Sequence, residues 1–285
     1  MLQLEEAPGL YAFFSGLPVL SCSLQEIGMD HELVFQVWGH DMKKRLLTGL
    51  ALLAAAAGWM KSSAVLTKKE VRTVPFFQSD EKKTLLFVAD LHSRKLRRQD
   101  LPREKADYVL IGGDLAEPGT PMSVVHWNLQ MLTKAGPCFF VWGNNDHELA
   151  EKLAPLLKQY GLTELNNTAV SMDNGSWFLA GVDDATSYRD NLHQAMRHTE
   201  DPVLLLSHNP YIDWESFRSA RLVLSGHTHG GQIRIGPFGV EPLPGWYAFD
   251  GRLILLSSGY GTTRVPLRLG TRPAVHLIHL CPAEE

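Results

Sequence analysis

The stretch Thr84–His92, with the sequence TLLFVADLH, sets the pattern from which the fold follows. A short apolar run comes first, and Asp90 and His92 stand directly behind it. A continuous apolar run of this length is typical of a β-strand that is buried on both faces. The polar residues at its end therefore predict a strand that carries ligand-type side chains to one edge of a sheet.

The same pattern returns further along the chain. Each apolar run is followed by Asp, Asn or His, with glycines in most cases: YVLIGGD (108–114), CFFVWGNND (138–146), VLLLSHNP (203–210) and LVLSGHTHGG (222–231). Because sites in α/β sheets form outside the carboxyl ends of the strands, we expect all these strand ends to converge. Carboxylate, amide and imidazole groups together predict a metal site, with more ligands than one ion needs.

Each motif alone has an ordinary structural explanation. A DxH pair or a GGD turn is commonly a satisfied polar turn, and most histidines pack in a core or lie at the surface. What favours function is the conjunction, since the motifs occur in order and each follows a strand predicted to be buried.

Amphipathic stretches lie between the apolar runs and predict helices over 121–134, 148–160 and 188–198. Thr120 is a candidate N-cap of the first of them, with Pro121 at its first position. The alternation of strands and helices indicates an α/β layered fold. Beyond Gly231 the pattern predicts an antiparallel sheet that completes a second layer, with strands over 232–235, 253–256 and 274–280.

Composition excludes several classes of protein. The chain has 285 residues, of which 45% are hydrophobic, so it can bury a full core and is not intrinsically disordered. A net charge of -4 offers no basic field for a nucleic-acid backbone, so no nucleic-acid scaffold is expected as a partner. Cys22, Cys138 and Cys281 lie far apart without CxxC spacing, which argues against a disulfide framework and a thiolate zinc site.

The first 83 residues differ in character from the rest, which divides the chain into an extension over 1–83 and a domain over 84–285. Residues 42–64 begin with Met-Lys-Lys-Arg and continue as an uncharged Leu/Ala-rich run, the layout of a signal peptide or a short anchor. The run is shorter than the about 20 residues of a comfortable spanning helix, and a buried core helix is the alternative. We expect a membrane-associated or exported protein of a bacterial-type cell envelope.

Two further expectations concern the extension. A signal that begins at an internal methionine leaves either Met42 or Met1 as the start of the protein. Residues 65–83 are polar and charged, which is typical of a juxtamembrane spacer.

Together, DLH, GGD, GNND, SHNP and GHTHGGQ resemble the motifs of the calcineurin-like metallophosphoesterase superfamily. Residues 257–273 resemble its branch of YkuE-type bacterial phosphodiesterases, whose members commonly carry an N-terminal export or membrane segment. The resemblance covers roughly residues 84–280. It implies an α/β fold, a four-layer αββα sandwich of two mixed β-sheets flanked by helices, which holds two divalent metal ions.

The resemblance also implies a ligand set. One metal takes Asp90, His92, Asp114 and His229, and the other takes Asp114, Asn144, His208 and His227, with Asp114 as the bridge. These ligand types admit Mn, Fe, Zn or Co.

The implied reaction is hydrolysis of a phosphodiester or pyrophosphate bond by a hydroxide that bridges the two metals. The substrate is expected to be a phosphorylated small molecule or a lipid-linked compound. A phosphomonoesterase and a catalytically weak metal-binding scaffold are the alternatives.

Asn145, Asp146 and His147 are the candidate catalytic residues. The superfamily usually has His where this chain has Asn145, and that His stabilises the transition state or protonates the leaving group. An amide can donate a hydrogen bond to a phosphoryl oxygen, but it cannot act as a general acid. His147 could supply the proton instead, or it could begin the next helix and pack there.

Other side chains have both a functional and a structural interpretation. Asp183 and Asp184 could reach the mouth of the site or form a solvated turn. Three arginines could bind phosphate or lie at the surface: Arg264, Arg268 and Arg272. Two aromatic residues could line a substrate cleft or pack within their own loop: Trp246 and Tyr247.

Overall fold

The computed structural model describes residues 31–78, 80–213 and 220–283. The chain divides into two compact units, residues 1–57 and 58–285. In the first unit, the described residues belong to helix α3 (His31–Ser63), which continues into the second unit. Residues 1–30 of the predicted extension over 1–83 lie outside the described residues.

Two six-stranded sheets form the centre of the second unit. In order, the first sheet contains β1 (Lys68–Phe77), β12 (Ala274–Pro282), β2 (Lys83–Val88), β3 (Tyr108–Ile111), β4 (Cys138–Phe140) and β5 (Thr163–Glu164). In order, the second contains β10 (Gly245–Phe249), β11 (Arg252–Leu256), β9 (Ala220–Ser225), β8 (Val203–Ser207), β7 (Trp177–Val182) and β6 (Thr168–Met172). Both sheets are mixed, because β12 runs antiparallel to β2 in the first, and β10 to β11 and β6 to β7 in the second, whereas the remaining neighbours are parallel.

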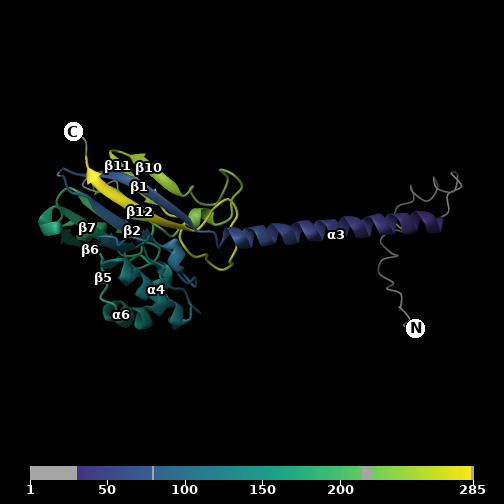
Figure 1. The fold of residues 1–285 in the computed structure, drawn as a ribbon, viewed down its shortest axis with the longest axis horizontal. Coiled ribbons are helices and arrows are strands. Elements are labelled where there is room, and N and C mark those ends of the chain that lie inside the picture. Colours follow the sequence, from purple (N-terminus) through teal and green to yellow (C-terminus); the bar gives the residue numbers. More distant parts are fainter. Residues whose placement is uncertain (1–30, 79, 214–219, 284–285) are drawn as a thin grey trace. The chain divides into compact units, whose positions relative to one another are not determined.

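Helices cover the outer faces of the sheets (Figure 1). The first sheet packs against α4 (Met122–Ala135) and α6 (Ala150–Gln159), and the second against α7 (Leu192–Met196). The alternation along β2 shows the layering, since Leu86 and Val88 face the helices whereas Leu85 and Phe87 face the other sheet. The expected four-layer αββα sandwich is therefore confirmed.

The predicted strand over 232–235 is wrong. Its residues make only isolated bridges, from Ile233 to Leu269 and from Ile235 to Phe238. The backbone turns here because Gly231, Gln232 and Gly236 all have positive φ values, which a strand cannot accommodate.

The predicted helices differ at their ends. The helix predicted over 148–160 corresponds to α6, a separate short helix, α5 (Asn144–Glu148), precedes it, and the helix over 188–198 shortens to α7. Thr120 does not cap α4; its hydroxyl accepts a hydrogen bond from the Glu117 amide at 3.1 Å instead.

Residues 68–77 do not belong to a spacer, because they form β1 at the edge of the first sheet. The strand pairs in parallel with β12 and buries Val74, Phe76 and Phe77 against Trp177. Its first half is charged and exposed, which hid it from the pattern of apolar runs. The boundary drawn at 83/84 therefore lies inside β2, after its first residue.

Within α3, the segment Met42–Ser63 is long and apolar enough to cross a membrane by length and composition. Its large apolar side chains are exposed rather than packed in a core, which disfavours the buried-helix alternative: Met42, Leu46, Leu47, Leu50, Leu52, Leu53 and Trp59.

Candidate metal centre

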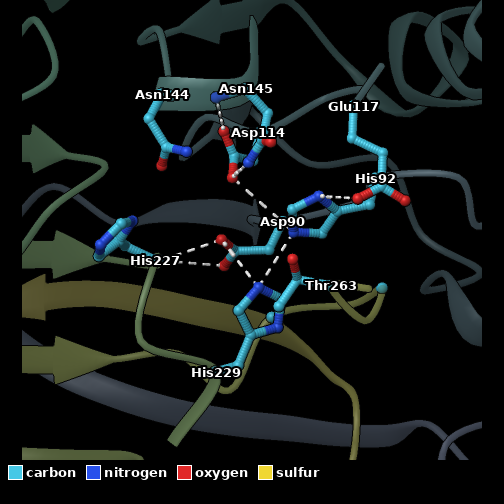
Figure 2. Close-up of polar contacts among 12 residues, drawn as sticks. Asp90, His92, Asp114, Glu117, Asn144, Asn145, His227, His229 and Thr263 are labelled. Atoms are coloured by element: carbon cyan, nitrogen blue, oxygen red, sulfur yellow. Dashed lines mark hydrogen bonds and ion pairs between the residues drawn. The ribbon is translucent and has the colours of Figure 1, made fainter. Parts of the chain in front are cut away.

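The predicted ligands follow the carboxyl ends of the central strands and lie close together (Figure 2). Asp90 and His92 follow β2, Asp114 follows β3, Asn144 begins α5 after β4, His208 follows β8, and His227 and His229 follow β9. Most of these residues have positive φ values: Asp90, His92, Asp114, His227 and His229. Such backbone strain costs free energy and is typical of functional sites.

One group of donors consists of Asp90, His92 and His229, all buried. The Nε2 atoms of His92 and His229 lie 3.0 Å apart, and the Asp90 Oδ1 lies 3.6 Å from the His229 Nε2. Two imidazole nitrogens that face each other beside a carboxylate oxygen are arranged as ligands around one cation.

A second group gathers around His208. Its Nε2 lies 3.1 Å from the His227 Nδ1, 3.3 Å from the Asn144 Oδ1 and 3.6 Å from the Asp114 Oδ2. Asp90 and Asp114 can also hold an ion together with His208. Imidazole nitrogen, amide oxygen and carboxylate oxygen again meet at one point.

Asp114 lies between the two groups. Its Oδ2 is 3.7 Å from the His92 Nε2, on one side, and 3.6 Å from the His208 Nε2, on the other. The carboxylate is held by Asn145, whose backbone N–H donates to Oδ1 at 2.9 Å and whose side-chain amide donates to Oδ2 at 2.6 Å. Gly143 makes room for it, because a Cβ there would come within 2.2 Å of the Asp114 Oδ1.

The donors have the chemistry that a divalent cation requires. The His208 Nδ1 lies 2.9 Å from the Gly112 carbonyl, which can only accept, so Nδ1 carries the hydrogen and Nε2 presents its lone pair to the centre. Burial, and then the charge of His92, lower the pKa of His229 well below its usual value, which keeps this imidazole neutral.

The carboxylates show the need for a counter-charge. Burial raises the pKa of Asp90 to about 6, because a charged carboxylate is disfavoured away from water. Burial lowers the pKa of His208, but Asp114 and Asp90 raise it by more, to about 9. A divalent cation fits here, since it would balance the same carboxylates in place of protons.

Two residues outside the ligand set hold the ligands in place. The Glu117 Oε2 lies 3.4 Å from the His92 Nδ1, the arrangement of a carboxylate that orients a metal-bound imidazole. Arg268 is fully buried beneath His229, where its Nη2 donates to the Ser258 and Gly261 carbonyls at 2.6 Å and lies 3.2 Å from the His229 Nδ1. Arg268 therefore contacts the centre through His229 from inside the protein.

Removal of the Glu117 charge is expected to weaken metal binding without unfolding the protein. Glu117→Gln should reduce metal affinity by about 10–100-fold, since His92 loses the carboxylate that orients its ring. Titration of the metal-free protein with Mn²⁺, followed by calorimetry, measures the change. Glu104→Gln, at an exposed surface position, is the matched control. Equal affinities in the two variants would contradict a role for Glu117.

The candidate catalytic residues are placed differently from one another. Asn145 lies at the edge of the centre, on Asp114. Asp146 is fully buried and accepts from the Gly143 and Ala116 backbone amides, an arrangement that shapes the turn after β4. Burial raises the pKa of Asp146 to about 7.

The His147 Nε2 lies 2.7 Å from the Asp183 Oδ1, and the ring stacks on Trp142. Asp183 and Asp184 are both buried, so the solvated-turn interpretation of this pair is wrong. Asp184 accepts hydrogen bonds from the backbone and hydroxyl of Ser187, both at 2.7 Å.

The structure also locates the remaining arginine and aromatic candidates. Arg264 and Arg272 are exposed, and Trp246 and Tyr247 lie in strand β10 rather than in a loop. Glu117 did not emerge from the sequence motifs, although it stands three residues after Asp114 in GGDLAE, where a second carboxylate so close to a ligand is a usable signal.

Residues 83–231 match the calcineurin-like phosphoesterase family. The chain is 37% identical over 253 residues to the uncharacterized protein YpbG of Bacillus subtilis, covering 84% of this chain and 98% of that protein. It is 31% identical over 223 residues to the phosphodiesterase YaeI of Escherichia coli, covering 69% and 81%. It is 27% identical over 197 residues to the uncharacterized metallophosphoesterase YkuE of B. subtilis, covering 62% and 68%.

Proposed function

The chain belongs to the calcineurin-like phosphoesterase family, and from this premise we propose that it hydrolyses phosphodiesters with two divalent metal ions. The position of Asp114 carries the proposal, because one of its oxygens lies 3.7 Å from the His92 Nε2 and 3.6 Å from the His208 Nε2. A carboxylate between two groups of donors is suited to bridge two cations.

When bound, the ions would generate a nucleophile from water near neutral pH and offset negative charge on the phosphoryl oxygens. One ion would be held by Asp90, His92, Asp114 and His229, and the other by Asp114, Asn144, His208 and His227. The chain itself holds the ligands in place. The Gly112 carbonyl fixes the tautomer of His208, and the Asn145 side chain fixes the orientation of the Asp114 carboxylate. Such preorganisation spares the reaction the cost of arranging these groups in the transition state.

A diester suits this site better than a monoester. Asn145 holds Asp114 and offers an amide, which cannot protonate a departing alkoxide. Among the described residues, no hydrogen bond or ion pair joins His147 to the metal ligands, so its use as a proton donor lacks support. An acidic leaving group departs without a proton, so a diester that carries one fits this site. The related YaeI is also named a phosphodiesterase.

A series of leaving groups tests this assignment. The wild-type rate should fall steeply as the leaving group becomes more basic, because protonation normally contributes about 10²–10⁴-fold. Asn145→His should flatten this dependence, with rates on alkyl esters rising more than rates on p-nitrophenyl esters. His147→Ala, which keeps Asn145, is the matched control and should leave the slope unchanged.

Several outcomes would contradict the proposal. A steeper slope in His147→Ala would identify His147 as the proton donor. Faster turnover of p-nitrophenyl phosphate than of bis-p-nitrophenyl phosphate would indicate a phosphomonoesterase. Bound metal without turnover of either ester would indicate a metal-binding scaffold.

We further propose that residues 42–64 hold the protein at a membrane of the cell envelope, so that its substrate is either a soluble phosphorylated compound or a lipid-linked one. The exposed apolar side chains of Met42–Ser63 support this placement. Burial of such a surface in lipid is favourable by roughly 25 cal/mol per Å².

Fractionation tests the anchor. The full chain should sediment with membranes and require detergent for release, whereas a chain that begins at Ser63 should be soluble and retain metal-dependent turnover. Ser63 is chosen because Arg94 and Arg97 donate to the Val65 carbonyl, and β1 follows at Lys68. A full chain that stays in the soluble fraction would reject the anchor.

A further inference from the structure

The segment that follows the last histidine ligands is unusually apolar for a surface. We call residues 233–243 the apolar loop. Its side chains Ile235, Phe238 and Val240 are exposed by 75%, 77% and 88%. Contiguous exposed apolar groups of this size mark interaction sites in soluble domains.

The apolar loop is held in its shape from inside. Arg234 is buried, and its guanidinium donates to the carbonyls of Gly230 and Pro237 at 2.7 Å and of Glu241 at 2.9 Å. Gly239 leaves the space that this side chain needs, since a Cβ there would come within 2.8 Å of the Arg234 Nη1. The arginine thus braces the loop while its apolar side chains remain on the outside.

Both ends of the apolar loop lie beside the end of the candidate membrane span. At its start, Ile233 pairs with Leu269, and the neighbouring Arg268 donates its backbone N–H to the Met60 carbonyl at 3.1 Å. At its end, Pro244 lines a cavity of about 400 Å³ together with Trp59 and Ser63. Met60, Trp59 and Ser63 form the last turn of the span Met42–Ser63.

The surroundings have the composition of a membrane-facing surface. Val65, Leu66 and Val265 are exposed apolar residues, and Trp59 is an exposed aromatic residue at the end of the span, where aromatic side chains favour the lipid headgroup region. Exposed basic residues lie at the end of the span and in the chain segment 264–272: Lys61, Arg264 and Arg272. Apolar and basic side chains at the end of a span match acyl chains and anionic headgroups, respectively.

From these observations we infer that the apolar loop dips into the surface of the lipid bilayer and presents the metal centre to lipid-linked phosphoric esters with an acidic leaving group, the class to which pyrophosphate-linked lipids belong. The inference rests on the proposed phosphodiesterase function and on the anchor. The loop and the centre are continuous, since Arg234 binds the carbonyl of Gly230, the residue that follows the ligand His229. The base of the loop, four residues after the ligand His229, is therefore braced against the residue next to that ligand.

Photocrosslinking in the full chain tests the contact. Phe238→p-benzoylphenylalanine is reconstituted through α3 into vesicles of phosphatidylethanolamine and phosphatidylglycerol and irradiated, and lipid adducts are measured by mass spectrometry. The matched control is Phe249→p-benzoylphenylalanine, an aromatic position that is 50% exposed. Phe249 pairs with Arg252, whereas Gly245 pairs with Leu256 near the centre, so Phe249 lies at the far end of the sheet.

We expect roughly tenfold more lipid adduct at position 238 than at 249, since only the apolar loop enters the bilayer. Equal adducts at both positions, or none at position 238, would overturn the inference. Turnover of bis-p-nitrophenyl phosphate in detergent, measured on the same proteins, separates the two proposals. An adduct without turnover would overturn the phosphodiesterase function, and turnover without an adduct would overturn the membrane contact alone.

Discussion

Asp114→Asn is expected to lower phosphodiester turnover by about three orders of magnitude or more, because it removes the charge that the two proposed metal ions would share. The metal content should fall from two ions towards one or none. An amide also offers a single acceptor oxygen, so if that oxygen keeps the position of Oδ2 between His92 and His208, the Asn145 backbone N–H loses its acceptor. Metal analysis and steady-state turnover of bis-p-nitrophenyl phosphate measure the two effects.

Asp250→Asn provides the matched control for this prediction. Asp250 lies in the exposed turn between β10 and β11, and its positive φ is tolerated by asparagine. This variant should keep both metals and its full rate. An Asp114→Asn protein that also kept two metals and near-normal turnover would contradict the assignment of Asp114 as the bridge.

Substitution of His208 or His227, the histidines of the second group, is expected to cause the other large loss of turnover. His208→Ala and His227→Ala should each lower turnover by about two to three orders of magnitude, because each removes a ligand of the same ion. Their facing nitrogens, 3.1 Å apart, indicate that they act as a unit. The double variant should therefore be little worse than either single variant.

Turnover and metal content of the single and double variants make up the test. His193→Ala, in α7 and outside the ligand set, is the control and should retain two metals. Losses that multiply in the double variant would show that His208 and His227 serve separate functions.

The site was more predictable from the sequence than the surfaces around it. Parallel strands buried on both faces appear as continuous apolar runs, and their carboxyl ends must lie along one edge, so the sequence alone could bring Asp90 and Asp114 together. His208 follows β8 of the second sheet, and the packing of the two sheets brings it to these carboxylates. The positive φ values of Asp90 and His92 were not predictable, because they arise from the packing of the turns.

Elements that depend on long-range pairing were missed. Strand β1 is charged in its first half; it pairs with β12, more than two hundred residues away in the chain, and its apolar end packs against Trp177. Arg268 looks like a surface or phosphate-binding residue in sequence, yet its partners are carbonyls and a ligand ring contributed by other loops. Sequence patterns report local periodicity and carry no signal for such contacts.

The arrangement of two ions around Asp114 is tested most directly by anomalous diffraction from crystals of the protein loaded with Mn²⁺. We expect two peaks about 3.5–4 Å apart, the spacing of dinuclear hydrolases. One peak should lie among Asp90, His92 and His229, the other among Asn144, His208 and His227, with Asp114 between them. A single peak, or peaks away from Asp114, would contradict the dinuclear centre.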